Sequence, residues 1–335
     1  MSQHNLSLLA QLQNSKTFTA RKAQNTMKLS KLFTSRIAGT VAIAAPLLVA
    51  CGSSSSEDQI TFAAVPSESA ATLETSYENI TKLISQETGK DVVFQNASDY
   101  AAVIEGMRAG QIDVASFGPF AYVIGKDSGI NMEAVVSPTD DKDVAPAYTS
   151  LAYVRADSDI NSLEDARGKT VCFVDAASTS GYLVPMKGLM DVDIDMDSDI
   201  EQILSGGHDA SLLSLEAGTC DVAFAHDTML TTLENSGQIE PGAFKEIWES
   251  DPITEDPISI NHDSLDPELA DQITEILRTK ANIPALVEAG ICESEEDCVL
   301  PEEITYGFVP VDDSDFDGIR ELCEVTQADA CKNIG

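Results

Sequence analysis

The feature that most constrains this fold is a run of hydroxyl residues between a predicted strand and a predicted helix. Residues 170–174 are apolar and rich in β-branched side chains, which predicts a buried strand, and residues 183–190 are apolar enough for a helix. Between them, residues 178–181 read Ser-Thr-Ser-Gly. The first turn of a helix has backbone N–H groups with no internal partner, so added hydroxyls predict an uncharged cup for an anion. The alternative is that one hydroxyl only caps the helix, which does not require three.

Strands and helices alternate along most of the chain. In the first series we expect strands at 59–65, 91–95, 113–117 and 132–136, and helices at 71–88, 101–109 and 120–126. In the second series we expect strands at 170–174, near residue 200 and at 220–225, and helices at 181–190, 209–217 and 228–235. This order predicts doubly wound α/β units, in which ligands bind at the carboxyl ends of the strands.

Two extended runs, 148–154 and 254–260, join the two series and predict two lobes with a hinge between them. The helical stretch 266–289 and the tail that follows it are expected to return to the first lobe. The expected divisions are 59–150 plus 258–335 for lobe 1 and 151–257 for lobe 2, which carries the anion cup.

Residues 1–50 have the pattern of an export signal. They contain six basic residues and no acidic ones, and they end in an apolar run over 37–50 that is too short for a comfortable membrane span. Cys51 follows Leu-Val-Ala and precedes a glycine and four serines, which resembles a bacterial lipobox. That resemblance implies cleavage before Cys51 and lipid attachment to its sulfur, with residues 51–58 as a polar tether. Met27 is an alternative start of the same signal.

The rest of the chain is strongly acidic. All 56 acidic residues lie after residue 50, against 14 of the 20 basic ones, which gives residues 51–335 a formal charge of −42. Such a surface repels nucleic acid and anionic lipid, so we expect no nucleic-acid partner and membrane attachment through the lipid anchor alone. An anionic ligand must then be held by short-range donors in a desolvated site.

Six cysteines follow Cys51, an even number that predicts disulfides in an exported protein. Fifteen pairings are possible, and proximity in the sequence favours Cys292–Cys298 and Cys323–Cys331. Cys172 and Cys220 then remain, and each opens a candidate strand, so neighbouring parallel strands could bring them together. A metal site is the rival interpretation, but the spacings are not of the Cys-x-x-Cys type and the chain has only four histidines, so we expect neither metal nor cofactor.

A second polar stretch follows in the same series. Two glycines allow the backbone to approach a ligand closely, and His208 comes directly after them at the expected start of a helix. The alternative is that His208 only caps or packs. Asp227 and Thr228 follow the expected strand at 220–225, so three strand-to-helix turns of lobe 2 bring polar groups to one edge of the sheet.

Three motifs resemble the phosphate-, phosphite- and phosphonate-binding proteins of bacterial ABC importers. They lie at 99–108, at 175–185 (Asp-Ala-Ala-Ser-Thr-Ser-Gly-Tyr-Leu-Val-Pro) and at 206–215, within a resemblance that covers most of residues 58–290. The resemblance implies a type II periplasmic-binding-protein fold, with two α/β lobes that close on the ligand about a two-strand hinge. It also implies that Ser178, Thr179 and Ser180 hold the oxyanion and that His208 is a further donor.

The same resemblance assigns residues outside the hydroxyl turn. Tyr100 and Tyr148 match two tyrosines from the first lobe and the hinge, and Asp256 matches an acidic residue of the second hinge run. Family members that bind aminoalkyl phosphonates have a glutamate where this chain has Thr228, beside Asp227. That departure favours a small oxyanion such as phosphate or phosphite.

The resemblance implies a monomeric, lipid-anchored receptor that passes its ligand to an ABC permease and its ATPase. We expect it at the outer face of the cytoplasmic membrane or in the periplasm. One alternative is a surface lipoprotein sensor of the same fold. Another, less favoured, is a serine hydrolase built from Ser178 or Ser180, His208 and Asp227, but no Gly-x-Ser-x-Gly elbow is present, so we expect no enzyme.

Overall fold

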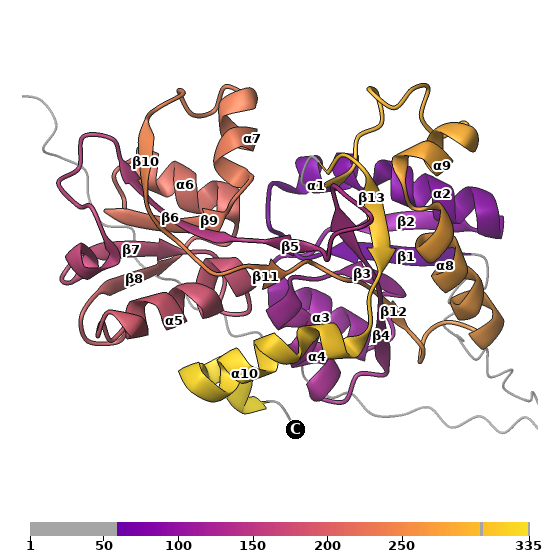
Figure 1. Ribbon diagram of the computed structural model, residues 1–335. Helices are drawn as coiled ribbons and strands as arrows, with labels where there is room; N and C mark the ends of the chain where they lie inside the picture. The colour runs from indigo at the N-terminus through magenta and orange to yellow at the C-terminus, as the bar shows by residue number, and fades with distance from the viewer. Residues whose placement is uncertain (1–58, 302–303, 334–335) are drawn as a thin grey trace, which may run out of the picture. The chain divides into compact units, whose positions relative to one another are not determined.

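The computed structural model describes residues 59–301 and 304–333. The expected export signal (1–50), the lipidation site Cys51 and the tether (51–58) lie outside these residues. We use lobe 1 for the six-stranded sheet and the helices packed on it, and lobe 2 for the five-stranded sheet and its helices (Figure 1). The mixed α/β class expected from the alternating pattern is confirmed.

The sheet of lobe 1 has the strand order β13-β4-β12-β3-β1-β2. Its strands are β1 (Gln59–Ala64), β2 (Asp91–Gln95), β3 (Val114–Ser116), β4 (Met132–Thr139), β12 (Ile258–Asn261) and β13 (Gly307–Pro310). Strand β1 runs parallel to β2 and β3, whereas β12 is antiparallel to β3 and β4 and β13 is antiparallel to β4. The carboxyl ends of the parallel strands therefore open onto a common edge.

Helices cover both faces of this sheet. Their bounds are α1 (Ala70–Ser76), α2 (Glu78–Thr88), α3 (Tyr100–Arg108), α4 (Pro119–Asp127), α8 (Pro267–Lys280), α9 (Ile283–Glu288) and α10 (Asp317–Thr326), with 3-10 turns η4 (Asp313–Phe316) and η5 (Asp329–Asn333). The predicted helix 71–88 divides at Tyr77, whose buried ring packs against Phe62 and Phe94. The predicted helix 266–289 divides before Ile283, because Pro284 cannot continue the hydrogen bonding of α8.

Lobe 2 has the strand order β10-β6-β9-β7-β8. Its strands are β6 (Ser150–Arg155), β7 (Thr170–Phe173), β8 (Glu201–Leu204), β9 (Val222–His226) and β10 (Phe244–Glu249). Its helices are η1 (Leu163–Ala166), α5 (Val184–Asp191), α6 (His208–Glu216) and α7 (Met229–Asn235), with a π-helical turn η2 (Thr179–Leu183) before α5. Strand β7 is parallel to β8 and β9, so the turns that follow these three strands share one edge.

Two short strands connect the sheets. Strand β5 (Ala147–Tyr148) pairs antiparallel with β11 (Ile253–Thr254). The extended run expected at 148–154 is thus divided into β5 and β6, and the run at 254–260 into β11 and β12. The chain passes between the two larger sheets along these two strands. The residue limits assigned to the lobes remain a prediction.

All three favoured disulfides are present. Cys172 in β7 is joined to Cys220 just before β9, with a Cα–Cα distance of 5.8 Å. The pairs Cys292–Cys298 and Cys323–Cys331 close short loops in the last part of the chain. The last pair joins α10 to η5.

The end of the chain packs against parts of both lobes. Phe316 lies against Tyr122 of α4, with ring centroids 4.8 Å apart, and Arg320 of α10 is paired with Asp127 at 2.8 Å. Phe316 belongs to the same buried cluster as Leu183 and Val184 of lobe 2. Within the described residues, no helix has the length and apolar character needed to cross a membrane.

Candidate ligand-binding site

The hydroxyl turn lies at the carboxyl end of β7, as expected, but its backbone is π-helical at 179–183 before α5 begins. Ser178 caps this turn, because its Oγ accepts a hydrogen bond of 3.1 Å from the backbone N–H of Gly181. A β-carbon at Gly181 would lie 2.3 Å from Cγ2 of Val174, so only glycine allows the turn to sit against the end of β7. A capping serine keeps its own hydroxyl hydrogen, and Ser178 can therefore both close the turn and donate to an anion.

Thr179 and Ser180 are tied to surrounding elements. Thr179 Oγ1 accepts a 2.8 Å hydrogen bond from the backbone N–H of Phe120, at the start of α4. The carbonyl of Ser180 accepts a 2.6 Å bond from the hydroxyl of Ser150 in β6. Ser178, Thr179 and Ser180 are each only 2 % exposed. The turn is thus a buried group of hydroxyls in contact with lobe 1.

Asp256 approaches the same place from the second connecting segment. A β-carbon at Gly118 would lie 3.3 Å from Thr179 Oγ1 and 3.9 Å from Asp256 Oδ1, so both oxygens face the residue that precedes α4. Gly118 is extended (φ −64°, ψ 149°) and is the N-cap residue of α4. The structure therefore brings Thr179 and Asp256 to one helix N-terminus, where the macrodipole favours negative charge.

His208 is the first residue of α6 and is 4 % exposed. Its backbone N–H donates a 2.7 Å hydrogen bond to the carbonyl of Ser67, in the loop after β1. Its Nδ1 accepts a 3.1 Å bond from the backbone N–H of His226. Burial, with a smaller effect of His226, holds the pKa of His208 well below its usual value. A neutral imidazole whose Nδ1 is an acceptor carries its proton on Nε2, so His208 is an uncharged Nε2–H donor.

Two carboxylates of lobe 2 also reach lobe 1. Asp175 accepts a 2.8 Å bond from the backbone N–H of Ala177, and its carboxylate also hydrogen-bonds the backbone of Tyr100 at the start of α3. Asp209 hydrogen-bonds the backbone of Ser69, the N-cap of α1. Burial raises the pKa of both carboxyl groups.

Together with Thr179, these two carboxylates place lobe 2 acceptors at the first turns of α1, α3 and α4. Neither Asp175 nor Asp209 was predicted as a site residue from the sequence, since each has the pattern of an ordinary polar residue at a turn. The available signal was their position within the motifs 175–185 and 206–215, which carry the resemblance.

The remaining predicted residues have different surroundings. Tyr100 and Tyr148 are buried in one apolar cluster. Asp227 accepts bonds from both the backbone N–H (2.9 Å) and the hydroxyl (3.2 Å) of Thr149. The hydroxyl of Thr228 is 3.1 Å from Nδ1 of His226. Asp227 therefore fixes the segment between β5 and β6. Thr228 hydrogen-bonds His226, which was not among the site residues predicted from the sequence.

These contacts bear on the hydrolase alternative. In a serine hydrolase, the base histidine donates from Nδ1 to a carboxylate that orients it. His208 Nδ1 instead accepts from a backbone N–H, and Asp227 bonds Thr149. The arrangement can hold an anion with neutral donors, and it does not form a nucleophile–base–carboxylate relay.

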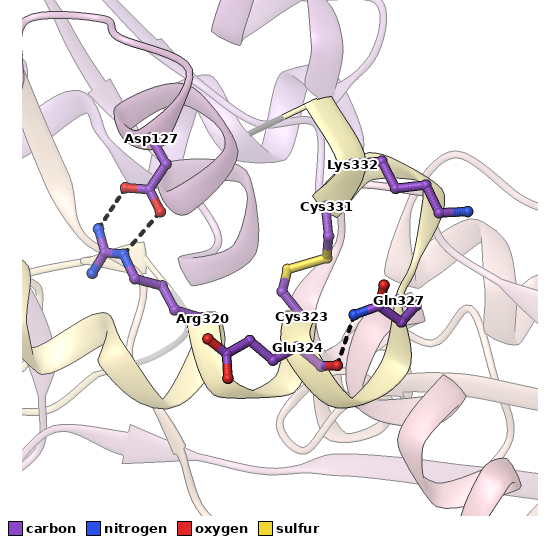
Figure 2. Close-up of a pocket in the computed structure, with 7 residues that line it drawn as sticks. All are labelled: Asp127, Arg320, Cys323, Glu324, Gln327, Cys331 and Lys332. Carbon is purple, nitrogen blue, oxygen red and sulfur yellow. Dashed lines mark hydrogen bonds and ion pairs between the residues drawn. A yellow bond between two sulfur atoms is a disulfide. The ribbon is translucent and has the colours of Figure 1, made fainter. Parts of the chain in front are cut away.

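A separate cavity of about 350 Å³ is lined by none of the predicted oxyanion-binding residues. Figure 2 shows it between α4 and the end of the chain, with the Cys323–Cys331 disulfide on its wall. Its Arg320 is bound to Asp127 and Asp313, and Tyr122 donates to the same Asp313 carboxylate at 2.8 Å. The Arg320–Asp127 ion pair and the Tyr122–Asp313 hydrogen bond join the tail to α4.

Comparison with known proteins decides the family. Residues 62–316 match the family described as ABC transporter, phosphonate, periplasmic substrate-binding protein. The chain belongs to this family. It is 41 % identical over 284 residues to the phosphate-import protein PhnD of Mycolicibacterium smegmatis, which covers 82 % of this chain and 88 % of that protein. It is 30 % identical over 206 residues to the phosphonates-binding periplasmic protein of Escherichia coli, 60 % of each chain.

Solved structures of such substrate-binding proteins agree in fold. The binding protein component of an ABC phosphonate transporter from Pseudomonas aeruginosa has a TM-score of 0.70 at 28 % identity, over 80 % of this chain and 86 % of that one. PhnD1 of Prochlorococcus marinus, solved with methylphosphonate, has a TM-score of 0.70 at 15 % identity, over 81 % and 99 %. The expected type II periplasmic-binding-protein fold is confirmed.

Proposed function

We propose that this substrate-binding protein binds a phosphorus oxyanion (phosphate, phosphite or a phosphonate) between its lobes and delivers it to the permease of an ABC importer. The observation that carries the proposal is a buried, uncharged donor set, made of the Ser178–Ser180 hydroxyls and the Nε2–H of His208. Neutral donors in a dry site bind an anion without the charge that this acidic surface would oppose.

The position of Asp256 supports a protonated ligand. Its Oδ1 and Thr179 Oγ1 both lie near Gly118. A carboxylate beside an oxyanion repels a fully ionised anion, but it accepts a proton from a P–OH group. We therefore expect monohydrogen phosphate to bind and sulfate, which has no proton to donate at neutral pH, to be rejected. The similarity to a phosphate-import protein points in the same direction.

Calorimetry with purified protein tests the proposal. Phosphate, phosphite, hypophosphite, methylphosphonate, 2-aminoethylphosphonate and sulfate are titrated separately, and melting temperatures are recorded with each. We expect phosphate or phosphite to bind and to raise the melting temperature, and sulfate to do neither. No binding of any phosphorus compound would reject the ligand class.

The anchor and the delivery step are also part of the proposal. We infer a monomer at the outer face of the cytoplasmic membrane or in the periplasm, held by lipid on Cys51. Replacing Cys51 by serine should move the protein from the membrane fraction to the soluble exported fraction. Deleting the protein should lower uptake of radiolabelled phosphate, whereas a pure sensor would leave uptake by an already expressed permease unchanged.

A further inference from the structure

Two histidines of lobe 2 form a close pair beside the hydroxyl turn. His208 begins α6, and His226 is the last residue of β9. Their ring centroids are 4.6 Å apart, with an edge-to-face angle of 66°. The residues are 4 % and 7 % exposed. They lie just after β8 and at the end of β9, on either side of β7 in the same sheet, and their rings are in contact.

In both rings Nδ1 takes part in a hydrogen bond and Nε2 does not. His208 Nδ1 accepts from the backbone N–H of His226, and His226 Nδ1 bonds the hydroxyl of Thr228. Among the residues that the structure describes, neither Nε2 has a hydrogen-bond partner. The fully buried side-chain atoms without a partner in the described residues are Ser205 Oγ and Ser259 Oγ. Both Nε2 atoms therefore keep some contact with solvent and are accessible to a ligand.

The pair is uncharged at neutral pH. Burial lowers the pKa of His226 to about 4, and the nearby Asp227 opposes this only in part. Burial also lowers the pKa of His208, and the neighbouring ring adds to the effect. A neutral imidazole offers one nitrogen as donor or acceptor, and both states suit phosphate, which carries P–O⁻ and P–OH groups.

We propose that His226 is a second ligand-binding imidazole, which contacts through Nε2 the same oxyanion as His208. This inference rests on the proposed function. Asp227 and Thr228 were the residues predicted from the sequence at the end of β9. In the structure Asp227 accepts a hydrogen bond from Thr149, and the Thr228 hydroxyl is hydrogen-bonded to His226. The residue at that turn with an unused polar atom is His226.

A double-mutant cycle tests direct contact against a merely supporting role. His226→Phe keeps a ring for packing and removes the nitrogens, and His226→Gln restores a polar group near the Nε2 position. His208→Asn keeps an acceptor for the backbone N–H of His226. We expect His226→Phe to weaken phosphate binding about tenfold in the wild-type and in the His208→Asn background, and His226→Gln to recover part of the loss.

His262→Phe is the matched control, because His262 lies outside the site and pairs with Glu133 at 3.1 Å. Its phosphate affinity should equal that of the wild type. If His226→Phe has no effect, or loses its effect when His208 is already asparagine, His226 does not contact the ligand and the inference is wrong. A wild-type protein that binds no phosphorus oxyanion would instead overturn the proposed function, and this inference with it.

Discussion

The backbone N–H of Phe120 donates a 2.8 Å hydrogen bond to Thr179 Oγ1, so the first turn of α4 in lobe 1 is joined directly to the hydroxyl turn of lobe 2. An N–H at a helix start has no partner inside its own helix, and here the partner comes from the other lobe. The hydroxyl that receives this bond still has a hydrogen to donate. Thr179 can thus donate its hydroxyl hydrogen to a ligand while it accepts the Phe120 N–H, which would connect the ligand to both lobes.

Removing the Thr179 hydroxyl should therefore weaken phosphate binding. We expect Thr179→Val to raise the dissociation constant by the equivalent of about 1–3 kcal/mol, since one buried hydrogen bond to a charged group and one buried N–H lose their partner. Thr179→Ser keeps the hydroxyl and should bind almost as tightly as the wild type. Calorimetry on both variants checks this, and equal affinity for valine and threonine would remove Thr179 from the site.

The interlobe carboxylate of Asp209 gives a prediction with opposite outcomes for two substitutions. Asp209→Asn keeps an acceptor for the backbone of Ser69 and removes a charge that burial disfavours, so stability at pH 7 should stay the same or rise. Asp209→Ala removes the acceptor and should lower the free energy of unfolding by about 1–2 kcal/mol. Chemical denaturation measures both. A loss of stability in Asp209→Asn equal to that in Asp209→Ala would mean that the charge itself is required.

The histidine pair makes stability depend on pH in a definite direction. The pKa of His226 is about 4 in the folded protein, against an ordinary value of 6.5, so between these values the unfolded chain binds the additional proton. The free energy of unfolding should therefore fall as pH falls from 6.5 to 4, by up to about 3 kcal/mol for this residue. His226→Phe should show a shallower slope over that window in urea denaturation, and a slope identical to wild type would contradict the assignment.

Gly181 should tolerate no side chain. A β-carbon there would lie 2.3 Å from Val174 Cγ2 and 2.7 Å from Ser178 Oγ, so Gly181→Ala must displace the turn or the end of β7. We expect it to lower the free energy of unfolding by about 1–3 kcal/mol and to weaken phosphate binding. In a Val174→Gly background the additional cost of Gly181→Ala should shrink, because Cγ2 and Cβ of Val174, at 2.3 and 2.4 Å from the new β-carbon, are both gone. Additive effects of the two substitutions would show that this contact is not the cause.

The elements that sequence alone located are those whose signals are local. The buried strand at 170–173 and the hydroxyl turn after it follow from short patterns. The pairing of Cys172 with Cys220 followed only because the other four cysteines pair within short loops. Strand β10 was missed because Phe244–Glu249 carries three charged residues and pairs only along one edge, with β6. An edge strand with one solvated side lacks the apolar run that marks a buried strand.

The interlobe contacts could not be predicted for a different reason. Asp175 and Asp209 reach Tyr100 and Ser69, which lie far away in the sequence, and no periodic pattern encodes such pairs. The role proposed for His226 likewise depends on the hydrogen bond between its Nδ1 and the Thr228 hydroxyl, which the sequence does not reveal. The turns at the candidate site could therefore be located from the sequence. Which side chain in each turn bonds the protein, and which stays open to a ligand, required the tertiary structure.

The shared packing of the chain end has a consequence for biogenesis. Leu183 and Val184, directly behind the hydroxyl turn, share a buried cluster with Phe316, Ile319 and Cys323. A polypeptide that is translocated from its N-terminal end exposes the turn long before these residues emerge. On the export route proposed above, the turn gains its complete hydrophobic support only when residues 316–323 have crossed the membrane. The proposed ligand binding is then expected only after that point.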